Sequence, residues 1–340
     1  MSLESASLDA TAPRPEASAR TDHPILVMMR QRILFGVVTV VVVSFIVFWA
    51  TQVLPGNAAA AILGTHTTPR MLHQLEAKLH LNRGLLSQYW LWFSELLRGR
   101  PGTSLSSGEG VWQLVGPRLA NSAFLVAVSG SIGTVLGIAL GAYAGLRRDR
   151  PLDHVLSVST LAISALPAFV VAIGLIVVFS TVVWHILPAV SLLAPGTYAW
   201  NAPRLLVLPV ATLVIVIVPY LFRMMRAAMI EALESEYVEM ARLKGVAPWK
   251  VVLRHALPNA IAPTIQVVGL NFLYLAGGIV VVEWVFNFPG VGQGLINAVS
   301  DRDIPVIQFI VVVLAAFYVV VNFLSDLIAL LASPRRRLPR

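Results

Sequence analysis

The 340-residue sequence contains no cysteine and few charged residues. The absence of cysteine excludes disulfide bonds and thiolate metal sites. Asp, Glu, Lys and Arg make up 12% of the residues, whereas a soluble domain has about 25%. Because 57% of the residues are hydrophobic and the mean hydropathy is +0.78, we expect a lipid bilayer to be the main solvent of the chain.

Sequence motifs of several enzyme classes are also missing. The chain has no His-Glu-x-x-His zinc motif and no Gly-x-x-x-x-Gly-Lys phosphate-binding loop, so we predict neither zinc-dependent hydrolysis nor ATP hydrolysis by this chain. No Ser, His and Asp set lies in the apolar segments at a spacing that would serve intramembrane catalysis. His73 and His80 share one helix face with Glu76, but we expect a solvated surface there rather than a metal site.

Six apolar segments are each long enough to cross about 30 Å of hydrocarbon as a helix. They comprise residues 31–53, 119–146, 154–185, 204–229, 263–286 and 306–331. The third segment is long, and Pro167 near its middle predicts a kink or a break into two pieces. The sequence therefore predicts an all-α, polytopic membrane protein with six transmembrane helices.

The distribution of basic residues predicts how these helices are oriented. Arg30 and Arg32 precede the first segment, RRDR at 147–150 follows the second, and three arginines follow the sixth. Six more basic residues lie between Arg223 and Arg254, whereas residues 186–203 carry no charge. Since cytoplasmic loops are enriched in Lys and Arg, we expect both termini in the cytoplasm (N-in/C-in). The same enrichment accounts for the net charge of +8 without a nucleic-acid partner.

The chain divides into membrane-embedded and flanking parts. Residues 1–24 are rich in Ala, Ser and Pro and predict a disordered cytoplasmic tail, while residues 332–340 predict a basic one. The segment 25–53 exceeds the roughly 7 to 15 apolar residues of a signal peptide and lacks a small-residue cleavage site, so we predict a retained transmembrane helix. Residues 54–118 form the predicted extracytoplasmic segment, and residues 119–331 the membrane core.

The extracytoplasmic segment contains two notable patterns. The stretch TPRMLHQLEAKLHL at 68–81 has apolar residues at helical spacing and predicts a short amphipathic helix. The aromatic side chains Tyr89, Trp90, Trp92 and Phe93 follow closely. Aromatic residues beside a span usually lie at the membrane interface, so we expect this location for them, with stacking against a substrate as the alternative.

Acidic residues are rare within the apolar segments. Glu283 lies near the outer end of the fifth segment and Asp326 near the inner end of the sixth. Intramembrane acids are costly and often functional, but each lies close enough to an interface for a structural role, which we favour. The segments hold no series of carboxylates or histidines that would serve as a proton relay.

Ten charged residues lie between Arg223 and His255. The stretch RAAMIEALESEYVEMARLK at 226–244 predicts one helix with an i,i+3 pair of Glu239 and Arg242. Gly245 predicts its end, and Pro248 predicts the start of a second helix that ends near Pro258. The small residues Ala241 and Gly245 would let a partner approach closely. We therefore predict that this loop docks a cytoplasmic protein, with a merely solvated loop as the alternative.

The loop also resembles a known motif. Glu239-x-Ala241-x-x-x-Gly245, nine residues, and then His255-Ala256-Leu257-Pro258 is similar to the EAA loop of ABC-importer permeases. That pattern is Glu-Ala-Ala, three residues, Gly, nine residues and Ile-x-Leu-Pro, so Met240 and His255 depart from it.

Most of the chain beyond the N-terminal tail resembles the same family, and in particular the B-type permease subunits of dipeptide and oligopeptide importers. Similar stretches occur at 54–64, 102–111, 118–127, 164–169, 282–299, 301–308 and 321–327. Two departures lie in the predicted extracytoplasmic segment. Asn57 and Ala58 replace the Asp-Pro of a Gly-Asp-Pro motif, and Gly99-Arg100-Pro101-Gly102 replaces Gly-Asp-Leu-Gly. Both lose a carboxylate, which leaves the substrate and the docking of a binding protein open.

The resemblance implies a type I ABC-importer permease fold in the bacterial inner membrane. It also implies partners: a second, C-type permease, two ATPase subunits or one fused ATPase, and an extracytoplasmic substrate-binding protein. The chain itself would be non-catalytic and hold no cofactor, because ATP and Mg would bind to the ATPase subunits. The resemblance assigns coupling to the ATPase to the EAA loop, about residues 231–262. The residues that carry this role are Glu239, Ala241, Arg242, Lys244, Gly245, Leu257 and Pro258.

The expected substrates are dipeptides or oligopeptides. Nickel chelates, glutathione and haem are alternatives within the same fold. A gradient-driven secondary transporter is a second class, but it requires intramembrane ion-site residues and often internal repeats, and neither is evident.

Overall fold

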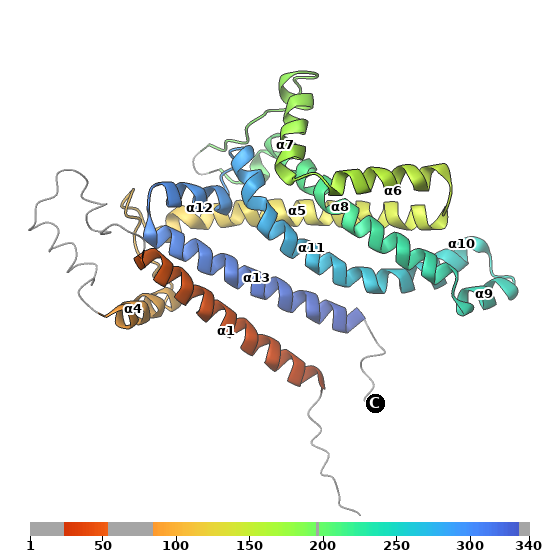
Figure 1. Cartoon of the computed structure of the whole chain (residues 1–340), viewed down its shortest axis with the longest axis horizontal. Helices are drawn as coiled ribbons and strands as arrows, with labels where there is room; N and C mark the ends of the chain where they lie inside the picture. Colours follow the sequence, from red (N-terminus) through yellow and green to blue (C-terminus); the bar gives the residue numbers. More distant parts are fainter. Residues whose placement is uncertain (1–23, 54–83, 195–196, 333–340) are drawn as a thin grey trace, which may run out of the picture.

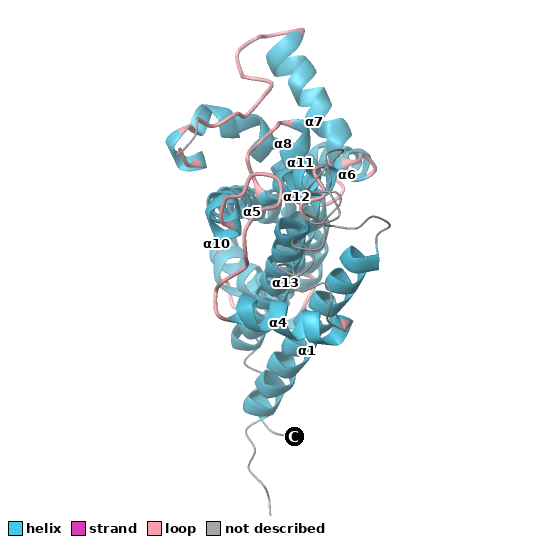
Figure 2. Cartoon of the chain, turned by 90° about the vertical axis from the view of Figure 1, so that its left-hand side faces the viewer, coloured by secondary structure: helices cyan, strands magenta, loops and turns pink. Residues whose placement is uncertain are grey.

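The computed structural model describes residues 24–53, 84–194 and 197–332 (Figure 1). The long helices are α1 (Pro24–Val53), α5 (Val111–Leu146), α8 (Pro203–Leu233), α11 (Leu257–Val285) and α13 (Ile304–Ala332). The shorter helices are α4 (Leu85–Leu97), α6 (Pro151–Ser164), α7 (Ala168–Ile176), α9 (Glu236–Leu243), α10 (Pro248–Lys250) and α12 (Val291–Ser300). Two π-helical segments, η2 (Val177–Thr181) and η4 (Val251–Ala256), and the 3-10 helix η3 (Ala199–Asn201) complete the order. These ranges contain no strand (Figure 2), which confirms the all-α fold class.

Several predictions concern residues outside the described ranges. They are the tail before residue 24, the Asn57 and Ala58 departure, the amphipathic helix at 68–81 with His73, Glu76 and His80, and the basic tail from residue 333.

Five helical stretches of the described chain are long and apolar enough to cross a membrane. They are Met29–Gln52, Val111–Leu146, Pro203–Leu233, Pro248–Val285 and Ile304–Leu327. The remaining predicted segment, 154–185, is divided between α6 and α7, whose axes differ by 105°. The total is six if this bent pair is one crossing. The number of crossings and the N-in/C-in orientation stay predictions.

Pro167 lies at the break between α6 and α7, as predicted. Its φ of −61° and ψ of 147° place it as the residue before α7. Proline has no N–H to donate and disfavours helical conformation in the preceding residue, so α6 ends at Ser164 and α7 begins at Ala168. Figures 1 and 2 show α7 leaving the bundle to one side, whereas α6 follows the direction of α5 and α8.

A row of glycines lets α5 and α8 pack closely. It consists of Gly133, Gly137, Gly141 and Gly145, one every fourth residue. A Cβ atom at Gly137 would lie 2.5 Å from Cβ of Leu221, and one at Gly141 would lie 2.6 Å from the backbone oxygen of Phe222. Small residues at this spacing bring two helix backbones together in membrane proteins. The regular spacing of these glycines is visible in the sequence itself.

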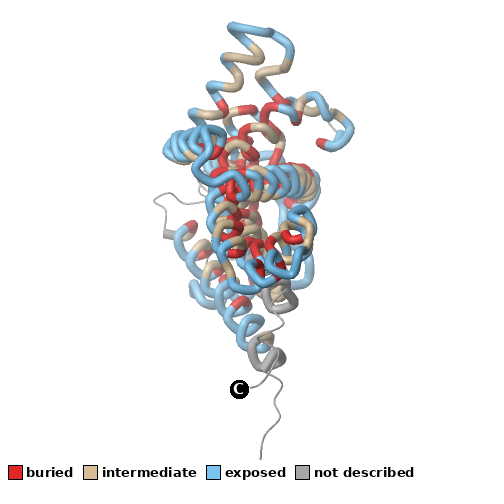
Figure 3. Tube along the Cα trace, turned by 90° about the vertical axis from the view of Figure 1, so that its right-hand side faces the viewer, coloured by how far each residue is buried: buried red, intermediate tan, exposed pale blue. Residues whose placement is uncertain are grey.

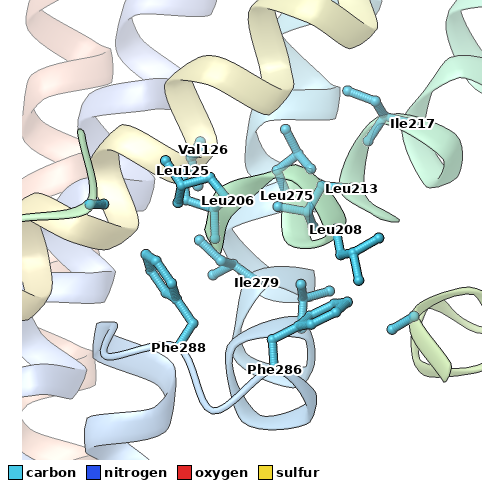
Figure 4. Close-up of a cluster of buried hydrophobic side chains, with 13 residues drawn as sticks. Leu125, Val126, Leu206, Leu208, Leu213, Ile217, Leu275, Ile279, Phe286 and Phe288 are labelled. Atoms are coloured by element: carbon cyan, nitrogen blue, oxygen red, sulfur yellow. The ribbon is translucent and has the colours of Figure 1, made fainter. Parts of the chain in front are cut away.

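The buried side chains of the described chain concentrate along the bundle axis, and the outer helices expose most of their surface (Figure 3). One cluster joins α5, α8 and α11 with Phe286 and Phe288 of the turn that follows α11 (Figure 4). A second cluster joins the last turns of α8 to α9 and η4. Figure 1 shows the two ends of the bundle. Helices α9 and α10 lie at one end, which we call the loop end, and α4 and α12 lie at the other, which we call the opposite end.

Helix α1 is peripheral and packs along α13 (Figure 1). The amide of Gln308 donates to the hydroxyl of Thr51 at 2.8 Å. Near the other end of the pair, Arg32 and Asp326 form an ion pair at 3.0 Å. This ion pair supports the structural role that we expected for Asp326.

Candidate functional site: the loop at one end of the bundle

The predicted single helix at 226–244 is two helices, so this prediction was wrong. Helix α8 ends at Leu233, and α9 begins at Glu236. Between them, Ser235 is extended (φ −73°, ψ 147°), and its hydroxyl donates to the carbonyl of Ala232 at 2.5 Å. Serine favours helix starts, and acids in the first turn of a helix interact favourably with its dipole. Ser235 followed by Glu236 therefore indicates the start of a new helix, but the high helix propensity of the surrounding residues favoured one continuous helix.

Gly245 ends α9, as predicted. The N–H of Gly245 donates to the carbonyl of Arg242 at 2.9 Å, and that of Val246 donates to Ala241 at 3.2 Å. These two bonds form a Schellman motif, which requires a left-handed residue after the helix. Gly245 has a φ of +75°, so this position favours glycine for its conformation. Pro248 then begins α10, which also confirms the prediction.

The second helix does not end near Pro258, contrary to prediction. Val251–Ala256 forms a π-helical segment, and α11 continues from Leu257 through Pro258 to Val285. Because proline has no N–H, the i,i+4 ladder must be interrupted before it. The π-helix interrupts the ladder here: the N–H of Leu257 donates to Val252, five residues earlier. The chain therefore passes from the loop into a long apolar helix without a break.

The structure separates the predicted coupling residues by burial. Glu239, Arg242, Lys244, Gly245 and Pro258 are exposed. Ala241 is buried in the cluster that joins α8, α9 and η4, and Leu257 packs against that cluster. The small side chain of Ala241 thus serves packing within this chain rather than the approach of a partner. Glu239 and Arg242, both described, form no ion pair with each other, contrary to the predicted i,i+3 pair.

Large apolar side chains are exposed on the same loop. They are Tyr237, Met240, Leu243, Trp249 and Leu253. Leu243 is 75% exposed and Trp249 is 62% exposed, and the ammonium of Lys250 lies 5.4 Å from the Trp249 ring centre. An exposed apolar patch rimmed by charged residues is typical of a protein interaction surface. Of these five residues, the sequence singles out only Met240, as a departure from the EAA pattern, because exposure depends on how the helices pack.

Buried contacts and one exposed ion pair join the loop to the bundle, and a buried ion pair joins α8 to α6 beside it. The guanidinium of Arg226 makes two bonds of 2.6 Å to the carboxylate of Asp153, which is 1% exposed. Arg148 pairs with Glu234 at 2.5 Å, at the junction of α8 and α9. A cavity of about 330 Å³ lies between α9, η4 and the ends of α5 and α8. The buried side chains Val238 and Ala241 of α9 share a cluster with Met225 and Met229 of α8, and Ala142 of α5 packs against that cluster. The loop is therefore connected to α8 and α5, so its movement would be transmitted to these helices.

Glu283 lies at the opposite end of the bundle and is completely buried. It accepts hydrogen bonds from the Ser122 hydroxyl at 2.5 Å and from the N–H groups of Gly292 and Gln293 at 2.7 and 3.3 Å. This carboxylate joins α11 to α5 and to the first turn of α12. These contacts support the structural role that we expected.

The aromatic residues of α4 are divided between packing and exposure. Tyr89 and Phe93 are buried against Phe48 of α1, and the hydroxyls of Tyr89 and Ser44 lie 2.9 Å apart. Trp90 is exposed. Packing within this chain therefore accounts for Tyr89 and Phe93.

Family models match nearly all of the chain beyond the N-terminal tail. The family described as binding-protein-dependent transport system inner membrane component matches residues 137–338. The model for the N-terminal part of such membrane components matches residues 25–125. The chain belongs to this family of ABC-importer permeases. It is accordingly an inner-membrane permease subunit, as the EAA-like spacing predicted.

Curated relatives of this permease cover almost its whole length. A probable peptide ABC transporter permease of Sinorhizobium fredii is 31% identical over 92% of this chain and 99% of its own length. A metal-staphylopine import system permease of Staphylococcus aureus is 32% identical over 88% and 94%. A glutathione transport system permease of Shigella flexneri is 33% identical over 90% and 97%.

A solved structure supports the permease fold. A chain of the MetNI methionine ABC transporter, crystallised in inward-facing conformations, matches with a TM-score of 0.52. The match covers 65% of this permease and 97% of that chain, at 18% sequence identity. The fold is thus that of a type I ABC-importer permease, as predicted.

Proposed function

We propose that the exposed face of α9 and α10 docks on an ATPase subunit and couples ATP hydrolysis to the movement of this permease. The observation that carries the proposal is the exposed apolar side chains of Met240, Leu243 and Trp249 on a loop whose buried residues pack against α8 and α5. Around the patch, Glu239, Arg242 and Lys244 supply polar contacts. Ala241, Gly245, Leu257 and Pro258 act indirectly, because they set the shape of the loop.

The proposed substrates are dipeptides or oligopeptides delivered by an extracytoplasmic binding protein. The Sinorhizobium relative is named for peptides and the Shigella relative for glutathione. The Staphylococcus relative is named for metal-staphylopine. Chelated metals, including nickel, and glutathione are therefore the alternatives to test beside peptides, with haem as a further one. Binding of each ligand to the partner binding protein, measured by calorimetry, separates these classes.

The proposed complex contains a second, C-type permease and two ATPase subunits or one fused ATPase. In this complex ATP and Mg bind to the ATPase subunits, and the permease has no catalytic activity or cofactor of its own. Purification of the chain from its native membrane tests this composition: a second permease and an ATPase should copurify. ATP hydrolysis by the isolated chain would contradict the non-catalytic role.

The docking surface is tested by Leu243→Asp. Placing a charge in the centre of an apolar contact should reduce ATPase copurification and substrate-stimulated ATP hydrolysis by about tenfold or more. Leu97→Asp is the matched control, because Leu97 has nearly the same exposure, 74% against 75%, but lies in α4 at the opposite end. Wild-type ATP hydrolysis by Leu243→Asp would contradict the proposed docking surface.

A further inference from the structure

Tyr220 of α8 lies beside both Arg223 of the same helix and Tyr274 of α11, and all three are exposed. The ring centres of Tyr220 and Tyr274 lie 5.8 Å apart, and the guanidinium carbon of Arg223 lies 5.3 Å from the Tyr220 ring centre. Tyr220 is 40% and Tyr274 51% exposed. At 1.5 Å per residue, Tyr220 lies about 20 Å along α8 from its end at Leu233, and Tyr274 lies about 25 Å into α11.

Arg223 has no acidic partner in the described chain. It forms no ion pair or hydrogen bond with any described residue, whereas Arg226, one turn away, is fully engaged by Asp153. The Tyr220 and Tyr274 hydroxyls likewise bond to no described group. Arg223, counted above with the basic residues of the loop, lies within the predicted apolar segment 204–229, about 15 Å from the end of α8 at Leu233. A charged side chain in a span is costly in lipid and usually faces a bundle interior or a water-filled cavity. The face with these three side chains therefore turns toward water or toward a ligand rather than toward lipid.

We propose that Tyr220, Arg223 and Tyr274 line the translocation pathway and that Arg223 binds a carboxylate of the passing substrate. This inference rests on the proposed transport of peptides. A guanidinium matches a carboxylate with two parallel hydrogen bonds, and the hydroxyls of the two exposed tyrosines are further hydrogen-bond donors. Every peptide with a free C-terminus carries a carboxylate there whatever its side chains, so one arginine serves substrates of different sequence.

The surroundings of the three side chains fit a transient site. Gly277, one turn from Tyr274 on α11, is exposed, and a Cβ atom there would meet nothing within 4 Å. The site is therefore open on one side and does not enclose a ligand. A pathway requires binding that is strong enough to admit a substrate and weak enough to release it.

Two features of the same chain provide controls. Arg147 lies 5.1 Å from the Tyr143 ring centre, which is the same kind of pair, but it directly follows the last turn of α5 and is the first residue of the basic stretch 147–150. Val320 is an exposed apolar residue of α13, 53% exposed. The first control tests whether an arginine–tyrosine pair at another position has the same effect. The second compares this face with an exposed apolar face of α13.

Thiol labelling tests the location of the face, and the absence of native cysteine makes it specific. Tyr274→Cys and Val320→Cys are made in the complete importer in inside-out membrane vesicles, and both are treated with a charged methanethiosulfonate reagent. We expect modification of the cysteine at 274 to be about tenfold faster, because the charged reagent requires water. Equal rates at the two positions would overturn the assignment of this face to the pathway.

Uptake by the reconstituted complex tests whether Arg223 binds the substrate carboxylate. We expect Arg223→Gln to reduce uptake of tri-alanine by about tenfold and uptake of tri-alanine amide by about twofold or less. Each rate is compared at saturation of the binding protein. Arg147→Gln should have no effect, and Arg223→Lys should restore part of the uptake. Equal uptake of tri-alanine by wild type and Arg223→Gln, or equal loss for acid and amide, would overturn the role of Arg223.

A third peptide distinguishes the sources of the carboxylate. If Asp-Ala-Ala amide shows the same dependence on Arg223 as tri-alanine, a side-chain carboxylate also serves; without that dependence, the C-terminal group is the ligand. If the wild-type importer carries none of these peptides, the peptide function and the carboxylate role fail together. The thiol labelling still decides the location of the face in that case.

Discussion

The two ends of the helix bundle differ in what they do with polar groups. At the opposite end, Glu283 and Asp303 are buried and surrounded by donors: Asp303 accepts from the hydroxyls of Ser104 and Ser106 and from the N–H of Leu105. At the loop end, charged and large apolar side chains of α9 and α10 point outward and lack such partners in the described chain. The opposite end is thus built to hold its own shape. Near the loop end Asp153 is a comparable buried acid, bonded by Arg226, but α9 and α10 themselves present a surface to a partner.

The contrast has a physical basis. A buried carboxylate is tolerated only where hydrogen bonds replace water, so each buried acid holds several segments in one arrangement. Exposed leucine and tryptophan gain nothing within this chain, and they contribute stability only when a partner covers them. Rigid anchoring at one end and an exposed contact surface at the other are what a coupled transport subunit requires.

The largest effect on stability is expected from removing the buried carboxylate of Glu283 at the opposite end. Glu283→Ala leaves the Ser122 hydroxyl and the Gly292 N–H buried without an acceptor, so we expect a loss of about 2 to 5 kcal/mol in the free energy of unfolding. The melting temperature of the purified complex measures it. Glu283→Gln, which retains an acceptor oxygen, should lose less, and an unchanged melting temperature for the alanine variant would contradict the anchoring role.

An intermediate effect is expected at the loop end from Gly245→Ala. A side chain at a φ of +75° costs about 1 kcal/mol, which should increase amide hydrogen exchange in residues 236–250 by about fivefold. Gly245→Asn is the control, because asparagine tolerates the left-handed region better. Slower or unchanged exchange in the alanine variant would show that the Schellman motif does not stabilise the loop.

The smallest effect is expected from Arg148→Ala. Its ion pair with Glu234 joins side chains that are 49% and 65% exposed, and such pairs contribute about 0 to 1 kcal/mol. The melting temperature should therefore change little, whereas Arg226→Ala, which leaves the buried Asp153 without its two bonds, should lower it clearly. A large effect of Arg148→Ala would mean that the junction of α8 and α9 depends on this pair.

Local sequence rules predicted much of the loop but not its context. Gly245 and Pro248 were correctly placed because a turn residue and a helix start depend on the backbone of the residue itself. The single helix at 226–244 was wrong because helix propensity, summed over the stretch, outweighed the start signal at Ser235. The predicted helix end near Pro258 was wrong because the preceding π-helical segment already departs from the i,i+4 hydrogen-bond ladder. Proline, which has no N–H, can therefore follow it without ending the helix, and a proline rule alone does not anticipate this.

By itself the sequence determined the all-α class, the apolar helices, the break at Pro167 and the family, since hydropathy, proline geometry and motif spacing are properties of nearby residues. Only the tertiary structure decided which residues of distant segments contact each other. Ser122 and Glu283 are 161 positions apart and meet at 2.5 Å, and Tyr220 meets Tyr274 across two helices. Ala241 became an internal contact and Met240 an exposed one in the same way, because burial depends on how whole helices pack.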